Sequence, residues 1–391
     1  MPNNRTALMN PGKYHLGNLF TFPPVQNRKY IDRNMIKKIQ WKTSALINRR
    51  AYIGNVKLID KDNTSHIFTD SIFKSKSNKF DTFTLDRRID VAIGDGEEII
   101  RLIGYADRLL QYKQNTLHII NVSGQSEYLE STHKYKGVSH PNQVCETDYG
   151  VAWCNSHGVY FYDGKQVRDL FINKGIRTIS KTKWDAFYND SHETMIGYSP
   201  SEKQVVLFQD VTNGDDVMVY DMTTTSWVEG GGRAPNKQKT NFVNIWDGSL
   251  AFGYENLDNK TTVAPWTPAP TTAITPFAIQ TKNFNFGTQA NKKVTKVYIT
   301  LKGTNPTNIV PKFSINGGNF NGVFKDVNGV NITSSAPLPG SSTWTEIEML
   351  TDGNANNVKS FAVRLEQGSS GVVSDIQIND ITIVYRTKSV K

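Results

Sequence analysis

From about residue 41 onward, the sequence is a succession of short apolar or alternating segments, separated by turns rich in Gly, Asn, Asp or Ser. Segments of about four to eight residues with such boundaries are typical of β-strands. Very little of the chain has the period of about 3.6 residues that a helix requires. Aromatic residues, which favour strands, make up 11% of the chain. The chain is therefore predicted to be all-β.

The clearest group of strands lies in residues 150–170, which are predicted to form three strands joined by two very short turns. One of these turns is Asp163-Gly164, a pair that favours the positive φ angles of a two-residue hairpin. An aromatic residue precedes the aspartate and an apolar strand follows the turn. Tyr220-Asp221 begins a second stretch with the same order.

Such groups recur at intervals of roughly 40 to 55 residues, the spacing that a radial array of four-stranded sheets produces. In a β-propeller, each small sheet buries its faces against the neighbouring sheets. The sequence therefore predicts a β-propeller of about five blades, in a ring that need not be complete. A flat sandwich of many strands is the alternative.

Four regions of the chain differ in composition. Residues 1–40 contain scattered prolines and asparagines followed by a basic stretch, and are predicted to be an extended N-terminal arm that wraps a neighbour. Residues 41–258 form the predicted propeller. Residues 259–276 are rich in Thr, Pro and Ala, as in a semi-rigid linker. The alternating segments of residues 277–391 predict a C-terminal β-sandwich.

The formal net charge is +9 and the sequence pI is about 9.2, with 45 basic residues spread over the whole length. Because no basic helix, zinc finger or RNP-type aromatic stripe concentrates them, a solvated basic surface is favoured over sequence-specific nucleic-acid binding. Non-specific contact with DNA fits the charge. No segment has the roughly 20 apolar residues of a membrane span, and the N-terminus lacks the apolar core of a secretory signal.

Cysteine and histidine give no sign of a reactive or metal site. Cys145 and Cys154 lie among apolar or β-prone residues and are interpreted as small buried side chains. The 7 histidines include no HxH or HExxH pair, so His133, His140 and His157 are interpreted as turn or surface residues. No GxSxG elbow is present. No metal or other cofactor is predicted.

Two Gly- and Asp-containing loops are interpreted as turns. The stretch 94–96, Gly-Asp-Gly, lacks the Gly-Lys-Ser that follows in a phosphate-binding loop, and a hairpin turn is the better interpretation. Residues 213–216, Asn-Gly-Asp-Asp, are rich in oxygen ligands but do not have the spacing of a calcium loop.

Asp81, Asp86 and Asp90 come closest to a catalytic pair of acids, because glycosidases hold two carboxylates about 5 to 10 Å apart. Arg87 and Arg88 lie beside them, which favours structural ion pairs or turn caps. No catalytic, cofactor-binding or metal-ligating residue is therefore assigned, and the chain is predicted not to be an enzyme. A propeller glycosidase is the less favoured alternative.

Several segments occur in an order that is similar to a known family. They are an Asn-Arg-Arg-Ala-Tyr-Ile-Gly strand, a Ser-containing strand with a Phe-rich corner, an Asp-Gly turn leading to an apolar strand, and a final hairpin. In this sequence they are residues 48–54, 70–75, 80–83, 95–102, 107–113 and 158–164. Together they resemble the propeller region of phage tail proteins, the family of tail tubular protein B and the nozzle proteins of short-tailed phages.

This resemblance implies a structural virion protein of a bacteriophage tail or nozzle below the portal. The subunit would form part of a homo-oligomeric ring around the channel through which DNA is ejected. The implied partners are the portal, the adaptor or other tail proteins, and the implied location is the virion, assembled in the host cytoplasm. The chain is shorter than typical nozzle proteins and lacks their large N-terminal platform, which leaves its station in the tail open.

A second hypothesis is a carbohydrate- or receptor-binding module of a tail. It rests on the predicted sandwich and on two tryptophans, Trp266 and Trp344, because exposed aromatic rings are common contacts for sugars.

Overall fold

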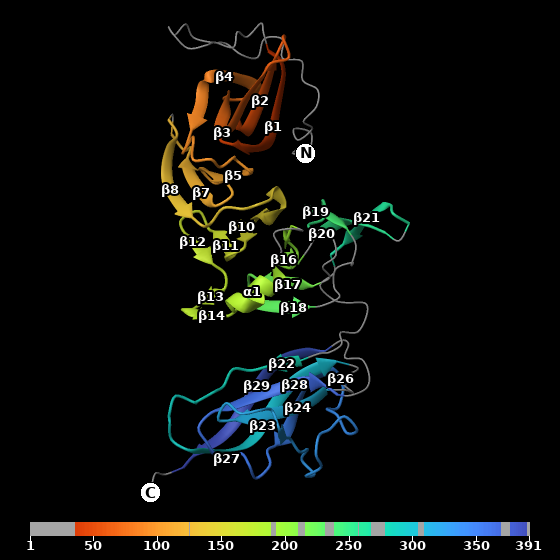
Figure 1. Cartoon of the computed structure of the whole chain (residues 1–391). Helices are drawn as coiled ribbons and strands as arrows, with labels where there is room; N and C mark the ends of the chain where they lie inside the picture. Colours follow the sequence, from red (N-terminus) through yellow and green to blue (C-terminus); the bar gives the residue numbers. More distant parts are fainter. Residues whose placement is uncertain are drawn as a thin grey trace. The chain divides into compact units, whose positions relative to one another are not determined.

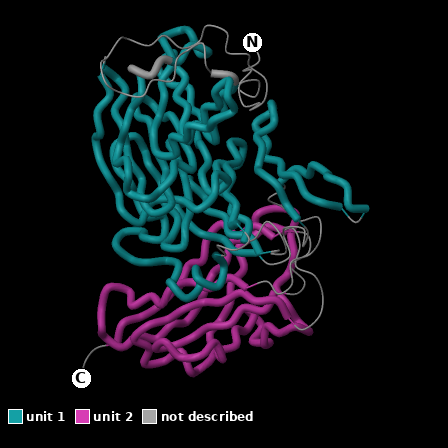
Figure 2. The backbone as a smooth tube through the Cα atoms, turned by 45° about the horizontal axis from the view of Figure 1, so that its top comes forward, with its two compact units in different colours: residues 1–266 teal, residues 267–391 magenta. Residues whose placement is uncertain are grey.

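The computed structural model divides the chain into two compact units, residues 1–266 and residues 267–391 (Figure 2). The described residues are 36–124, 126–188, 193–209, 216–230, 238–256, 258–266, 278–303, 309–368 and 376–388. Most of the predicted arm, the calcium-like loop up to residue 215 and the Pro-rich part of the predicted linker therefore lie outside the described residues.

Within its described residues, the first unit has five antiparallel sheets of three or four strands, each built from consecutive strands of the chain (Figure 1). Sheet A is β1 (Ile36–Ile47), β2 (Arg50–Asp60), β3 (Ser65–Lys76) and β4 (Lys79–Asp90); sheet B is β5 (Arg101–Tyr105), β6 (Arg108–Tyr112), β7 (Thr116–Asn121) and β8 (Tyr128–Lys134). Sheet C is β9 (Val144–Thr147), β10 (Gly150–Asn155), β11 (Gly158–Tyr162) and β12 (Val167–Asp169). Sheet D is β15 (Met195–Ser199), β16 (Gln204–Phe208), β17 (Val217–Asp221) and β18 (Ser226–Gly230), and sheet E is β19 (Lys239–Asn244), β20 (Leu250–Glu255) and β21 (Thr261–Pro265).

Shorter elements connect these sheets. The 3₁₀ helix η3 (Pro141–Gln143) precedes β9, and the hairpin of β13 (Ile172–Asn173) and β14 (Ile176–Arg177) follows sheet C. The helix α1 (Lys181–Phe187) leads toward sheet D. Ser180 caps α1, because its side chain accepts a hydrogen bond from the backbone N–H of Lys183 at 3.2 Å. In the described residues, no helix is long and apolar enough to cross a membrane.

Buried side chains join each sheet to the next in chain order. Successive residues of a strand point to opposite faces, so Leu109 on β6 packs toward sheet A and Leu110 packs toward sheet C. On the A side, Leu109 meets Tyr52; on the C side, the cluster of Leu110 contains Trp153. A fully buried leucine contributes roughly 1.5 to 3 kcal/mol. Because leaving either face of sheet B in water would lose this stabilisation, the sheet packs between sheets A and C.

The same arrangement continues through sheets C, D and E. Trp184 of α1 lies in a buried cluster that joins Cys154 of sheet C to Leu207 of sheet D. Phe208 of sheet D packs against Phe252 of sheet E, with ring centroids 4.9 Å apart. Small sheets stacked face to face in chain order are the blades of a β-propeller, as the sequence predicted. A single flat sandwich for the whole chain is the wrong alternative.

Aspartate side chains close the hairpins that mark the repeat. The Oδ1 atom of Asp163 accepts the backbone N–H groups of Lys165 and Gln166 at 2.8 and 2.9 Å. Asp221 accepts those of Thr223 and Thr224 in the same way, at 2.7 and 2.9 Å. The prediction of a two-residue Asp-Gly hairpin was wrong, because β11 ends at residue 162 and β12 begins at residue 167. Gly164 does have a positive φ angle, 92°, whereas Asp163 acts through its side chain.

The stretch 94–96 is not a hairpin turn, because β4 belongs to sheet A and β5 belongs to sheet B. It lies in the connection between the two sheets, where Gly94 and Gly96 have φ angles of 76° and 84°. Strand β4 ends at Asp90, so residues 91–93 also belong to this connection. Glycine supports the left-handed backbone of such a connection as well as that of a hairpin.

The boundaries of the propeller differ from those predicted. Strand β1 begins at residue 36, inside the predicted arm, and β21 lies inside the predicted linker 259–276. Val263 of β21 pairs with Gly253 of β20, and Pro265 pairs with Ala251. Proline is tolerated here because β21 is the edge strand of sheet E. The first unit therefore extends to residue 266.

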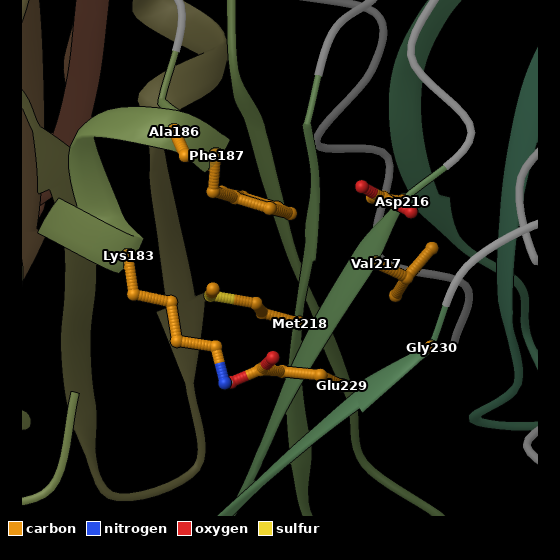
Figure 3. A pocket seen from close by; sticks show the side chains of 8 residues that line it. All are labelled: Lys183, Ala186, Phe187, Asp216, Val217, Met218, Glu229 and Gly230. Carbon is orange, nitrogen blue, oxygen red and sulfur yellow. The ribbon is translucent and has the colours of Figure 1, made fainter. Parts of the chain in front are cut away.

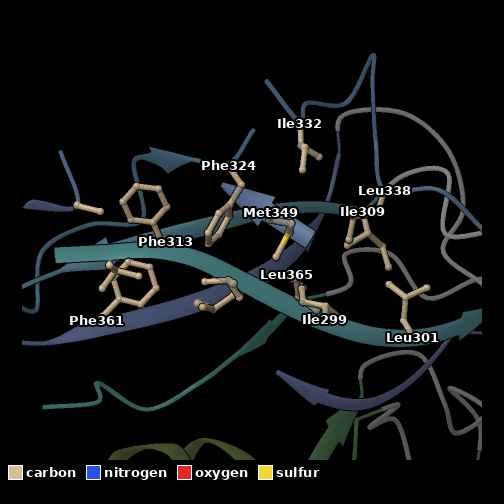
Figure 4. Packing of buried hydrophobic residues seen from close by; sticks show 14 of the residues in the cluster. Ile299, Leu301, Ile309, Phe313, Phe324, Ile332, Leu338, Met349, Phe361 and Leu365 are labelled. Carbon is tan, nitrogen blue, oxygen red and sulfur yellow. The ribbon is translucent and has the colours of Figure 1, made fainter. Parts of the chain in front are cut away.

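The second unit is a sandwich of two antiparallel sheets. One contains β22 (Ala278–Gln280), β28 (Phe361–Gln367), β24 (Ile309–Ile315) and β25 (Gly322–Val323); the other contains β26 (Ser341–Leu350), β23 (Lys292–Gly303), β27 (Asn356–Val358) and β29 (Gln377–Thr387). Alternate residues of both sheets point inward, and Figure 4 shows Phe313, Phe361 and Leu365 of one sheet with Ile299 and Met349 of the other. The predicted C-terminal β-sandwich is confirmed.

Candidate functional site: the joint between the first two sheets

Polar residues meet between sheets A and B and at the connection between them. We call this group the A–B joint; it comprises Asn48, Arg50, Asn55, Asp70, Lys74, Asp95, Glu98, Asp107, Lys113 and Glu127. Eight of the ten lie within the segments 48–54, 70–75, 95–102 and 107–113. The order of these segments along the chain therefore corresponds to one joint in space.

An ion pair between a buried lysine and a partly exposed aspartate forms the centre of the A–B joint. The Lys113 side chain is fully buried, and its Nζ atom lies 2.8 Å from both carboxylate oxygens of Asp95. The same Nζ donates to the backbone carbonyl of Ala92 at 2.7 Å. Asp70 of β3 accepts the backbone N–H of Gly94 at 2.7 Å. The connection between the two sheets is thus held from both sides.

The electrostatics of this centre favour fixed charges. Burial by itself raises the pKa of Asp95, but the hydrogen bonds from Lys113 and from the backbone N–H of Glu97 outweigh it, and the pKa lies below its usual value. Burial and the nearby Lys113 charge lower the pKa of His118. Asp95 is therefore ionised and His118 is neutral at neutral pH.

A buried carboxylate, that of Glu127, connects the two sheets. Glu127, 6% exposed, precedes β8 of sheet B and receives both Arg50 of β2 and Lys74 of β3. The Arg50 Nη1 atom lies 3.4 Å from its Oε1 atom. Burial, and then the negative charge of Glu127, raises the pKa of Tyr52 to about 12. The tyrosine is thus a neutral packing residue of the interface.

Two asparagines with left-handed backbone complete the A–B joint. Asn55 (φ 56°) lies where the β2–β3 register shifts, and its Nδ2 atom donates to Glu98 at 2.9 Å and to the Ile99 carbonyl at 3.0 Å. Asn48 (φ 49°) donates to Asp107 at 3.2 Å. Asparagine tolerates this backbone conformation and supplies the amide. The A–B joint is thus a set of ion pairs and amide hydrogen bonds that hold the two sheets together, and it does not have the arrangement of a catalytic site.

The sequence reasoning missed Lys113 and Glu127. Each is an ordinary charged residue whose partner lies far along the chain, 18 residues away for Lys113 and Asp95. One signal was present for Lys113: it shares a strand face with Leu109 and Gln111, both of which are buried. A charged residue in phase with buried ones predicts an internal partner.

A pocket of about 270 Å³ lies between α1 and sheet D (Figure 3). Lys183 and Glu229 form an ion pair across it with Nζ and Oε1 2.5 Å apart, beside Met218 and Phe187. Asp216, the one described residue of the calcium-like loop, also lines it. In the described residues, no group of three or more His, Cys, Asp or Glu is arranged to hold a metal ion.

The acids considered for catalysis do not converge. Asp90 pairs with Arg88 on the same strand at 2.7 Å, as favoured from the sequence. Asp81 and Asp90 lie near opposite ends of β4. The end near Asp81 pairs with Lys76 of β3, whereas Asp90 pairs with Ser71. Lys76 and Ser71 are five residues apart on β3, a distance of roughly 16 Å. This exceeds the separation that glycosidases use. The side chain of Asp86 lies outside the described residues.

The histidines and cysteines have local structural partners. The Nδ1 atom of His140 lies 2.9 Å from the Glu193 carboxylate, and His133 and His157 each have a neighbouring serine within 3.3 Å. Cys154 is fully buried, whereas Cys145 is only partly shielded at the edge of the same cluster.

The two tryptophans considered for sugar binding differ in exposure. Trp266 is 9% exposed and packs against Phe208 in the cluster between sheets D and E. It is therefore a core residue, and its assignment to a sugar site was wrong. Trp344 on β26 is 50% exposed.

No protein-family model matches the chain, and no curated protein matches it. Solved structures do. A chain of a mitotic checkpoint complex is 10% identical, with 62% of this chain and 82% of that chain covered and a TM-score of 0.36. YCF48 bound to D1 peptide is 10% identical, with 86% and 93% covered and a TM-score of 0.34. Virginiamycin B lyase from Staphylococcus aureus is 8% identical, with 59% and 84% covered and a TM-score of 0.34. Likenesses at this level concern the fold alone.

Proposed function

We propose that the chain is a structural subunit of a bacteriophage tail or nozzle, which forms part of a homo-oligomeric ring around the DNA-exit channel and has no catalytic role. The observation that carries the proposal is the A–B joint. The segments that resemble the phage family are those whose polar residues fasten two blades together.

A protein that forms the wall of a DNA channel needs sheets that keep one orientation relative to each other. The A–B joint would hold sheets A and B in such an orientation. Another packing of sheet A on sheet B would leave the buried carboxylate of Glu127 without Arg50 and Lys74. Removing one partner of a buried pair costs about 3 to 5 kcal/mol. The joint therefore selects one arrangement, even though such pairs add little net stability compared with apolar packing.

The charge of the chain also supports the proposal. A net charge of +9 favours weak contact with DNA or with acidic neighbouring proteins. Because this attraction arises from counterion release, it weakens as salt is raised.

The test is to locate the chain in purified phage particles, with a gold label on its C-terminus. The proposal expects label at the tail, below the portal, in several copies per particle. Label on the capsid surface, or no incorporation into particles, would contradict it.

A second candidate function is glycan binding through Trp344, whose half-exposed indole lies on a solvent-facing strand of the sandwich. On a glycan array, the full-length chain would then bind a sugar and Trp344→Ala would abolish that binding. A wild-type chain that binds no glycan removes this candidate.

A further inference from the structure

The edge of the sandwich formed by β26 has the features of a docking site for an extended segment. β26 pairs with β23 on one side and, within the described residues, with no other strand on the opposite side. At its C-terminal end, Leu350 exchanges two backbone hydrogen bonds with Lys325, at 2.8 and 2.9 Å, on the side away from β23.

Strand geometry extends this edge toward the middle of β26. Backbone groups alternate in direction along a strand, so those of Glu348 and Glu346 point to the same side as those of Leu350. An edge of unpaired N–H and C=O groups is a template for pairing with another strand.

A groove follows the same edge. It has a volume of about 410 Å³ and is formed by β26 and the loop of residues 326–339. Its apolar lining includes Val330, which is 55% exposed, and Leu338. Such a groove beside a free edge provides room for alternate side chains of an added strand.

The rim of the groove is acidic. Asp326, Glu346 and Glu348 all line it. Glu348 is held by Lys296 at 2.6 Å and by the Tyr298 hydroxyl at 3.0 Å, whereas Glu346 forms no ion pair with a described residue. The side chain of Glu346 is exposed, and it lies on the opposite face of β26 from Ile347 and Met349, which pack in the core of the sandwich.

The sequence of residues 1–35, which lie outside the described residues, contains a segment that matches this edge. Residues 12–22 are free of proline and are bounded by Pro11 and Pro23. In an extended strand, the face of the even-numbered residues would carry Tyr14, Leu16, Asn18, Phe20 and Phe22, and the other face would carry Lys13, His15, Leu19 and Thr21. One face would thus be mainly apolar, and the other begins with basic residues.

We propose that residues 12–22 of a neighbouring copy of this chain add as a strand to the free edge of β26. The aromatic and leucine face fills the groove, and Lys13 lies near Glu346. This inference rests on the proposed ring, because it names the contact that links its subunits. The residues between 22 and 36 span up to about 45 to 50 Å when extended, which is enough to reach a second molecule. A head-to-tail contact of this kind closes into a ring when the rotation permits.

The direct test is peptide binding, which does not depend on ring formation. A fluorescein-labelled peptide of residues 11–24 is titrated into the chain that lacks residues 1–24, and fluorescence anisotropy is measured. The proposal expects saturable binding, weakened at least tenfold by Val330→Asp in the groove. The matched control is Val384→Asp on β29, an exposed valine at the other edge of the same sheet. Circular dichroism checks that both variants fold.

Absence of peptide binding, or equal weakening by both variants, would overturn the proposal. Mixing distinguishes a neighbouring copy from the chain's own arm. The truncated copy has the groove but no segment 12–22, and the Val330→Asp copy has the segment but an altered groove. Each alone should sediment as a monomer, and the mixture should form a dimer held by one segment in one groove. If the truncated chain still forms rings, the proposed contact is wrong and the proposed function stands. If the wild-type chain stays monomeric and binds its own arm, both fail.

Discussion

Lys113 and Asp95 form an ion pair in which the lysine side chain is fully buried and its Nζ atom lies 2.8 Å from both carboxylate oxygens. The lysine directly follows β6 of sheet B, and the aspartate lies in the connection from sheet A to sheet B. Their pairing holds this connection against sheet B, and the first two predictions concern it.

Asp95→Asn should destabilise the first unit by about 1 to 3 kcal/mol, because the buried ammonium of Lys113 loses its charged acceptor and keeps only the Ala92 carbonyl and a neutral amide. Chemical denaturation followed by tryptophan fluorescence measures this loss. The control is Asp185→Asn on α1, which removes an exposed i,i+4 pair with Lys181 and should cost less than about 1 kcal/mol. Equal costs for the two variants would contradict a structural role for the buried pair.

The double variant Asp95→Asn/Lys113→Met should be more stable than Asp95→Asn alone. Replacing both partners of a buried pair removes the uncompensated charge and is often neutral. A double-mutant cycle, measured by the same denaturation, should give a coupling of about 0.5 to 3 kcal/mol. Simple additivity of the two single changes would show that the side chains do not interact.

Asp163 should make stability depend on acid pH. Burial raises the pKa of Asp163. The hydrogen bonds from the backbone N–H groups of Gln166 and Lys165 and the ion pair with Arg168 have the larger, opposite effect, and the pKa is lowered to about 2. A carboxyl with a depressed pKa stabilises the fold above its unfolded value, and this contribution disappears as the pH falls through the folded value. Asp163→Asn keeps the acceptor oxygen and removes the charge. The variant should be less stable than wild type at pH 7, with the difference shrinking between about pH 4 and pH 2. A difference that is constant with pH would contradict this account.

Gly197→Ala tests the contact between sheets D and E. A Cβ atom at this position on β15 would lie 2.4 Å from the ring carbon Cγ of Phe242 on β19. Overpacking of this kind costs about 1 to 3 kcal/mol, and scanning calorimetry should show a lower melting temperature. Gly124→Ala is the control, since a Cβ atom there would have its nearest neighbour at 3.5 Å.

The strand content and the order of the sheets could be predicted because they depend on local pattern. Alternating apolar residues and turn residues mark the strands, and Asp163 and Asp221 close their turns with their own side chains. The length of each turn was less accessible, because it depends on which backbone groups the aspartate accepts. The strand β21 was missed because Pro265 suggested a linker, and only its edge position makes the proline tolerable.

The A–B joint could not be predicted from the same signals. Glu127 receives Arg50 and Lys74, residues separated from it by 77 and 53 positions along the chain. Such pairings depend on how sheet A lies on sheet B, and local pattern contains no information about it. The fold was needed to show that these polar residues meet.

Single-particle electron microscopy of the chain, mixed with a bacteriophage portal protein, tests the proposed function most directly. The proposal predicts closed rings of several copies, coaxial with the portal and surrounding an open channel. Isolated single copies that leave the portal unoccupied would contradict it.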